Sequence, residues 1–166
     1  MREIILLDTS VFCRILNAPK MCSSGEHQEA VAEMLMLIGR EKITTTLLLP
    51  VAAIYETGNH IAQNGDGDAR RKAALRFTQQ VQAAFRGEAP WTPTPLPMQE
   101  EMAGWLPLFP DCAMRGVGLG DLSIIKTFEQ QCELNPNARV RIWSYDAHLG
   151  AYDRMPSGSL FTPPAA

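Results

Sequence analysis

Residues 3–8 read Glu-Ile-Ile-Leu-Leu-Asp, a short and mostly apolar run that ends abruptly at an acid. A strand that is buried on both faces of a parallel sheet has this pattern. Further strands are expected at 43–48 and 139–144, and prolines restrict a fourth, 94–96, to a sheet edge. The helices expected between them span 11–16, 26–40, 50–63, 68–86, 98–108 and 121–133. Because strands and helices alternate, we predict a three-layer α/β/α fold with a mainly parallel central sheet.

The chain of 166 residues is 46% hydrophobic and 20% charged, which is the composition of an ordinary globular domain. We predict one domain over residues 1–153 and a loose tail over 154–166, where proline and glycine are frequent. The longest nearly apolar stretch, Leu47 to Tyr55, is far shorter than the roughly 20 residues that a membrane helix needs, so we expect no membrane partner. The N-terminus does not resemble a signal peptide and the cysteines form no C-x-x-C pair, which favours a cytoplasmic protein.

The net charge of −3 argues against a protein that coats nucleic acid through bulk positive charge. It does not exclude a nuclease, because the acids of a metal site contribute to that charge. Four basic residues lie within seven positions of the expected helix 68–86, namely Arg70, Arg71, Lys72 and Arg76. They form either a solvated helix face or a ridge that contacts RNA phosphates.

Four acids occupy positions at which α/β proteins bind ligands. Asp8 and Asp146 follow the first and last expected strands, and ligands of such sheets bind beyond the carboxyl ends of the strands. Asp121 begins a helix after a glycine-rich loop, and Glu56 lies in the helix that starts at Pro50. Three of the acids, Asp8, Asp121 and Asp146, could instead serve only as helix caps. A purely structural role is less easily assigned to Glu56, because its flanking residues Ala52, Ala53 and Ile54 look buried.

A cluster of carboxylates has a specific chemical meaning. Carboxylates that lie together repel one another, and a divalent cation is the usual compensation. Ligand sets made of oxygen alone favour Mg²⁺ or Mn²⁺. Such ions activate water and neutralise the charged oxygens during phosphoryl transfer, so the acids predict a hydrolase that acts on phosphodiester bonds.

Four stretches, taken in order, extend this prediction to a family. They read IILLDTSVF at 4–12, YETGN at 55–59, GLGDLSII at 118–125 and IWSYDAHL at 142–149. The chain resembles the PIN domain family over nearly its whole length, up to about Tyr152, although residues 65–110 are longer than in minimal toxins of that family. The resemblance implies a three-layer α/β fold and a metal-dependent ribonuclease, a class that includes the toxins of toxin–antitoxin pairs.

The resemblance also implies roles for individual residues. The four acids Asp8, Glu56, Asp121 and Asp146 would be the catalytic, metal-binding positions. Ser144 matches the usual hydroxyl residue two positions before the last acid, and Ser10 matches the small polar residue that supports the first.

Two further residues are candidates from their spacing alone. Asn59, one turn after Glu56, could hydrogen-bond the site or the substrate. Asp153, seven residues after Asp146, would share its helix face and is a candidate fifth acid.

We therefore expect an endoribonuclease that depends on Mg²⁺ or Mn²⁺. Its expected partner is RNA, and an antitoxin protein and a second copy of the chain are further candidates. The alternative is a non-catalytic PIN-like protein that binds RNA or a protein partner. A phosphatase with an aspartyl nucleophile is disfavoured, because Asp8-Thr9-Ser10 lacks the second Asp that such enzymes place two residues on.

Overall fold

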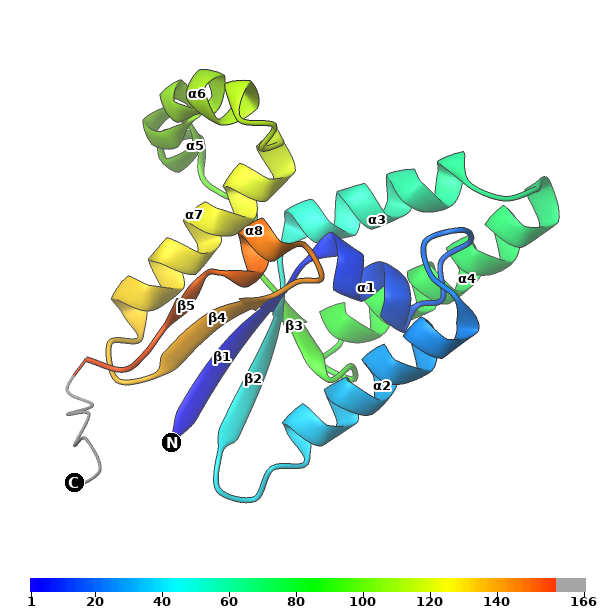
Figure 1. The fold of residues 1–166 in the computed structure, drawn as a ribbon, viewed down its shortest axis with the longest axis horizontal. Helices are drawn as coiled ribbons and strands as arrows, with labels where there is room; N and C mark the ends of the chain where they lie inside the picture. The colour runs from blue at the N-terminus through cyan, green and yellow to red at the C-terminus, as the bar shows by residue number, and fades with distance from the viewer. Residues whose placement is uncertain (158–166) are drawn as a thin grey trace.

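A five-stranded sheet forms the middle layer of the computed structural model, which describes residues 1–157 (Figure 1). The strands are β1 (Arg2–Leu7), β2 (Thr44–Leu49), β3 (Trp91–Pro93), β4 (Arg139–Trp143) and β5 (Asp153–Arg154). Their order across the sheet is β3-β2-β1-β4-β5, and β5 is antiparallel to β4 whereas the other pairs are parallel. The predicted fold class, α/β with a mainly parallel central sheet, is confirmed.

Helices lie on both faces of this sheet (Figure 1). They are α1 (Thr9–Ile15), α2 (Ser24–Ile38), α3 (Val51–Gln63), α4 (Gly67–Phe85), α5 (Gln99–Trp105), α6 (Phe109–Met114), α7 (Leu119–Leu134) and α8 (Ala147–Gly150), with a 3₁₀ turn η1 (Leu106–Leu108). Helix α2 packs against β2, and α7 packs against β4 and β1.

The two residues of β5 point to opposite faces of the sheet. Asp153 binds Arg139 on the face that α2 covers, and Arg154 donates hydrogen bonds to the carbonyls of Cys132 and Asn135 at the end of α7.

The central strand β1 is buried on both faces, as its apolar run predicts. Ile4, Ile5, Leu6 and Leu7 are each at most 1% exposed. Burying a side chain of this size stabilises the fold by about 1.5–3 kcal/mol. Strand β1 is therefore the buried centre of the sheet. This burial fixes the position of its carboxyl end and of the residue that follows it, Asp8.

The other end of β1 carries a buried charge. Glu3 is fully buried, and its carboxylate forms ion pairs with Arg40, Arg139 and Arg141. Burial alone would raise the pKa of Glu3, but the hydrogen bonds and charges of Arg40 and Arg141 hold it below its ordinary value. This arginine cluster lies on the face that α2 partly covers, at the end of the sheet opposite Asp8.

The edge strand lies three residues earlier than the expected 94–96. Trp91 is 3% exposed and packs against Phe12, whereas Leu96 is 64% exposed. The buried aromatic ring therefore decides which residues of the proline-rich segment join the sheet. Pro93 ends the strand at the sheet edge, where its missing N–H is tolerated.

The helix expected at 98–108 is divided into shorter pieces. Pro107 lies in the first turn of η1 and Pro110 in the first turn of α6. Proline is well placed at these positions, because the first N–H groups of a helix have no partner within it. The pieces α5, η1 and α6 form a lobe that projects beyond the carboxyl ends of the strands (Figure 1).

Two residues of the predicted tail, Arg154 and Ser157, form hydrogen bonds with the carbonyl of Pro136. Arg154 ends β5, and its guanidinium donates to the carbonyls of Cys132, Asn135 and Pro136, so it does not belong to a loose tail. Most of the predicted tail, 158–166, lies outside the described residues. Within residues 1–157, no helix combines the length and the apolar character that a membrane crossing needs.

Candidate functional site

The carboxyl ends of β1 and β4 form the topological switch point of the sheet. The chain leaves β1 toward β2 and β3, and it returns to β4 on the other side of β1. In such sheets the ligand crevice lies outside the strand ends at this point. The backbone N–H of Asp8 donates to the carbonyl of Trp143 at 3.0 Å, which places Asp8 beside the segment that carries Ser144 and Asp146.

Asp8 is 4% exposed, and one of its two carboxylate oxygens accepts three hydrogen bonds. Oδ2 accepts hydrogen bonds from Ser10 Oγ at 2.7 Å, Ser144 Oγ at 2.8 Å and the Ser10 N–H at 3.3 Å. The last of these bonds makes Asp8 the N-cap of α1, so the capping role considered as an alternative is present. No hydrogen bond within residues 1–157 reaches Oδ1, so this oxygen is available to a ligand.

Ser10 and Ser144 join α1 to the segment after β4. Their hydroxyl oxygens lie 3.5 Å apart, and each donates to Asp8. Ser10 Oγ accepts from the Tyr145 N–H at 3.1 Å, and Ser144 Oγ accepts from the Asp146 N–H at 2.9 Å. Ser10, predicted to support the first acid, and Ser144, predicted as the hydroxyl residue before the last acid, are therefore brought together at Asp8.

Asp146 caps the short helix α8. Its Oδ1 accepts from the N–H groups of His148 at 2.7 Å and Leu149 at 3.3 Å. Like Asp8, it thus combines a capping role with a place at the switch point, and the side chain remains exposed.

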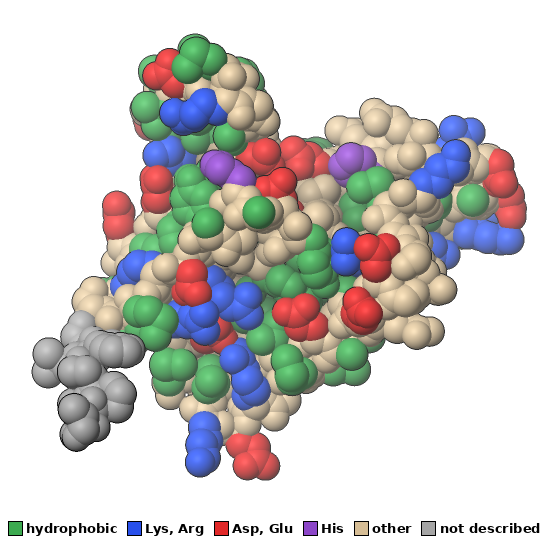
Figure 2. Space-filling view, viewed as in Figure 1, with side chains coloured by type: hydrophobic (Ala, Val, Ile, Leu, Met, Phe, Trp, Pro, Cys, Tyr) green, Lys and Arg blue, Asp and Glu red, His purple; other side chains and the backbone are tan. Residues whose placement is uncertain are grey.

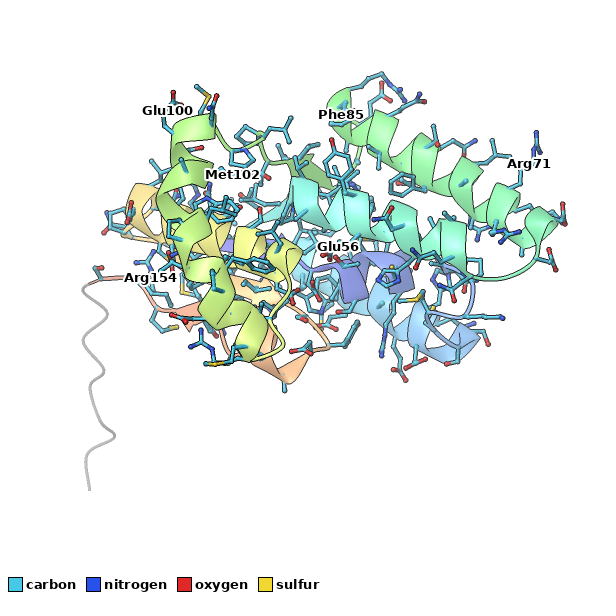
Figure 3. All side chains as sticks on the ribbon, turned by 90° about the horizontal axis from the view of Figure 1, so that it is seen from above. Glu56, Arg71, Phe85, Glu100, Met102 and Arg154 are labelled. Atoms are coloured by element: carbon cyan, nitrogen blue, oxygen red, sulfur yellow. The ribbon has the colours of Figure 1, made fainter. Side chains whose placement is uncertain are left out.

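Glu56 reaches the site from α3, where Figure 3 places it near the middle of the molecule. Its Oε2 accepts a hydrogen bond from Thr9 Oγ1 at 2.7 Å. Its Oε1 occupies the position that a side chain on Gly120 would fill, because a Cβ atom there would overlap the carboxylate. Glu56 therefore lies where α3, the start of α1 and the start of α7 meet.

Asp121 lies in the first turn of α7, where its Oδ2 accepts from the Gly118 N–H at 3.3 Å. Burial raises the pKa of Asp121 above its ordinary value, and the negative charges of Asp8 and Asp146 raise it further. The Gly118 N–H and the charge of His148 act in the opposite direction but do not cancel the effect. Asp121 is therefore close enough to Asp8 and Asp146 for their negative charges to raise its pKa.

Acidic side chains gather in a hollow on the upper edge of the molecule, between the α5–α6 lobe and the arm made by α3 and α4 (Figure 2). Oxygen donors of this kind suit a hard divalent cation. Within residues 1–157, however, no three Asp, Glu, His or Cys side chains lie close enough together to hold a metal ion. The donor chemistry thus fits such an ion, whereas the side chains as they stand do not enclose one.

Two predicted site residues form no hydrogen bond with this network within residues 1–157. Asn59 is exposed on α3. Asp153 lies in strand β5 rather than on a helix with Asp146, and Arg139 binds it at 2.9 Å. That guanidinium holds the pKa of Asp153 below its ordinary value. The prediction of a fifth acid at 153 is wrong, because the chain re-enters the sheet after α8.

The four basic residues of α4 do not form one ridge. Arg76 donates to the carbonyls of Leu16 at 3.3 Å and Asn17 at 3.1 Å, and Lys72 pairs with Asp68 at 2.7 Å. Arg70 and Arg71 are exposed, and Figure 3 shows Arg71 pointing outward at the far end of α4. Of the four, Arg70 and Arg71 are the two whose guanidinium groups form no hydrogen bond or ion pair within residues 1–157.

Three contacts at the site did not emerge from the sequence pattern. Thr9 and Gly120 both position Glu56, although both stand directly beside predicted acids in the chain. The guanidinium of Arg14 stacks over the ring of Tyr145, 3.8 Å from its centroid, next to the serine network. The adjacency of Thr9 and Gly120 to Asp8 and Asp121 was a usable signal, whereas the stacked pair is 131 positions apart in the chain and had none.

No family model, no curated protein and no solved structure matches this chain.

Proposed function

We propose that the protein is a PIN-like endoribonuclease that hydrolyses RNA with the help of Mg²⁺ or Mn²⁺. The observation that supports this most directly is the meeting of acids from separate elements at the switch point. Burial and then the negative charges of Asp8 and Asp146 raise the pKa of Asp121, and a serine pair holds Asp8 in place. Acids that repel one another in a fold are retained where a bound cation or a reaction needs them.

The residues have distinct roles in this proposal. Asp8, through its free Oδ1, and Asp146, Asp121 and Glu56 would hold the cation. A bound cation would supply Lewis acidity to water and to the scissile phosphate. Ser10 and Ser144 fix the other oxygen of Asp8. Each of these hydrogen bonds limits the motion of a carboxylate, so fewer side-chain rotamers have to be ordered when the cation binds.

Glu56 is positioned separately from the serine network. Thr9 holds one of its oxygens, and the missing side chain of Gly120 leaves room for the other. The proposal therefore assigns positioning roles to Thr9 and Gly120, in addition to the two serines.

A second candidate function is a non-catalytic PIN-like protein that binds RNA or a protein partner. This function would need no metal ion, and within residues 1–157 no three Asp, Glu, His or Cys side chains lie close enough together to enclose one. A cation could still bind these carboxylates, because Oε1 of Glu56 and Oδ2 of Asp146 accept no hydrogen bond within residues 1–157. The two candidates are separated by whether added metal produces cleavage.

The biological setting is also a proposal. We place the protein in the cytoplasm, as the toxin of a toxin–antitoxin pair, with an antitoxin or a second copy of the chain as a protein partner. A small DNA-binding protein encoded beside this gene would support the toxin role, and its absence would leave the ribonuclease proposal standing alone.

Incubation with a mixed RNA pool tests the activity directly. We expect cleavage with Mn²⁺, none with EDTA, and loss of cleavage in Asp8→Asn. The matched control is Asp68→Asn, which removes an exposed acid from α4 and should cleave like the wild type. Equal cleavage in EDTA, or unchanged cleavage by Asp8→Asn, would contradict the proposal. Tight RNA binding without cleavage under any metal would favour the second candidate.

A further inference from the structure

Helix α2 buries one face and exposes the other. Its buried residues are Ala30, Met34 and Leu37, and the helix packs against α1 and β2. On the outer face Leu35 is 55% exposed and Met36 is 63% exposed. Figure 2 shows hydrophobic and acidic side chains close together over this helix. Six exposed residues of this face and of the turn that follows it form the α2 stripe: Glu29, Ala32, Leu35, Met36, Gly39 and Lys42.

The ends of the α2 stripe carry opposite charges. The side chains of Glu29 and Lys42 form no ion pair and no hydrogen bond within residues 1–157. The neighbouring base Arg40, by contrast, pairs with the buried Glu3. The stripe therefore offers a partner two adjacent apolar side chains in the middle, an unpaired acid at one end and an unpaired base at the other.

The α2 stripe is complementary to itself when it is rotated by a half-turn about its apolar centre. Ala32 and Gly39 lie three residues outside the central pair on either side, and Glu29 and Lys42 lie six residues outside it. A two-fold axis through this centre brings two α2 helices together antiparallel, so that small residue meets small residue and acid meets base. Two-fold dimers, the commonest homo-oligomers, use one such patch on both copies. Small residues also let two helices approach to about 8 Å, the lower end of the usual distance between helix axes.

We propose that a second copy of this chain binds the α2 stripe and forms an antiparallel two-fold dimer. The central apolar pair of each copy packs against that of the other, and an acid–base pair closes each end. Standard interfaces bury about 1,600 Å² in total, and a single helix face is smaller than that, so association should be weak and should depend on concentration. The proposal assigns a surface to the second copy considered above as a partner, and it does not depend on the ribonuclease function.

Sedimentation equilibrium of the full chain tests the association. We expect the average mass to rise from one chain toward two as the concentration increases through the micromolar range. Met36→Glu places a charge in the apolar centre of each copy, so the dissociation constant should rise by about tenfold or more. Met114→Glu is the matched control, because Met114 is an exposed methionine of α6 outside the stripe. The mass of a single chain at every concentration, or an equal effect of the two variants, would overturn the proposal.

Exchange of the end charges tests the antiparallel arrangement. Glu29→Lys alone brings lysine against lysine at both ends, and Lys42→Glu alone brings acid against acid, so each variant should dissociate several-fold more readily than the wild type. An equal mixture of the two variants can form a heterodimer in which both ends regain opposite charges. The mixture should therefore associate nearly as tightly as the wild type, which a pairing of Glu29 with Lys42 inside one chain would not produce. A mixture that associates no better than its components would overturn the proposal.

Discussion

Gly120 of α7 is the residue that lets the carboxylate of Glu56 reach its place beside Thr9. A Cβ atom on Gly120 would overlap Oε1 of Glu56, while Thr9 holds Oε2. Two helices that are far apart in the chain are thus fitted to each other at a functional position. The glycine is required here by close approach and not by backbone conformation, because its φ lies outside the left-handed region.

Gly120→Ala should separate activity from stability. The added methyl group must push the Glu56 carboxylate aside, so we expect metal-dependent RNA cleavage to fall at least tenfold. Alanine is favoured over glycine inside a helix by about 0.5–1 kcal/mol, so the free energy of unfolding should change by less than about 1 kcal/mol. Cleavage assays and urea unfolding measure the two effects.

The matched control for this variant is Gly104→Ala in α5, where a Cβ atom would meet nothing within 4 Å. It should retain wild-type cleavage. Full activity in Gly120→Ala would show that the position of Glu56 does not matter for the reaction.

Asp121→Asn should stabilise the metal-free protein. The raised pKa of Asp121 means that its ionised form lowers stability near pH 7, and the wild type gains stability as the pH falls through the folded-state pKa. The variant should melt at a higher temperature than the wild type in EDTA and lack this gain at lower pH. Mn²⁺ should reverse the ranking, because binding stabilises the native state by about 2.7 kcal/mol at a hundredfold excess over Kd.

Asp111→Asn is the comparison variant, since Asp111 is exposed and also lies in the first turn of a helix. It should not gain stability in EDTA. If Asp121→Asn and the wild type gain the same amount from Mn²⁺, Asp121 is not a ligand.

Glu3→Gln should weaken the fold far from the candidate site. Removing one partner from a buried ion-pair cluster costs about 3–5 kcal/mol, here because Arg40 and Arg141 would lose the carboxylate that neutralises them and Arg139 would keep only Asp153. Because the pKa of Glu3 is lowered in the folded state, its ionised carboxylate stabilises the fold at pH values above its ordinary pKa, near 4.5. This stabilisation is lost as the pH falls through the folded-state pKa. Urea unfolding between pH 3 and pH 7 should show a flatter profile for the variant. Glu41→Gln changes an exposed acid that follows Arg40 in the chain, and it should leave the profile unchanged.

The basic residues of α4 should divide into two groups. Charge reversal of Arg70 and Arg71 together should weaken RNA binding and reduce the salt slope by about one for each phosphate that the variant no longer binds. Arg86→Glu, at the other end of α4 and paired with Glu88, is the control for a change of charge alone. Equal binding and equal salt slopes for the double variant and the wild type would assign Arg70 and Arg71 to a solvated surface.

The fold class followed from local patterns because the strongest of them is physically unambiguous. A run such as residues 4–7, bounded by acids, is stable only when it is buried on both faces, and the alternation of elements then requires a parallel sheet. The place of β3 could not be predicted this way. It depends on Trp91 packing against Phe12, which is a contact between residues far apart in the chain.

The candidate site was predictable where an acid directly follows a strand. Asp8 and Asp146 occupy the switch point for that reason, and the serines two positions from each of them complete the network. Asp153 was misplaced because helical spacing was carried past the end of α8, which is only four residues long. The separate behaviour of Arg76 depends on the carbonyls at the end of α1, and helix periodicity carries no information about them.

The buried carboxylate of Glu3 has a consequence for how β1 finds its place during folding. Four apolar residues in a row fit either face of the sheet, so hydrophobicity alone would tolerate a slip of β1 by one position. Such a slip would turn Glu3 away from Arg40, Arg139 and Arg141 and leave a charge unpaired in the interior. The arginines therefore fix the register of β1. Because they bind Glu3 at one end of the strand, the residue that follows the strand at the other end is Asp8.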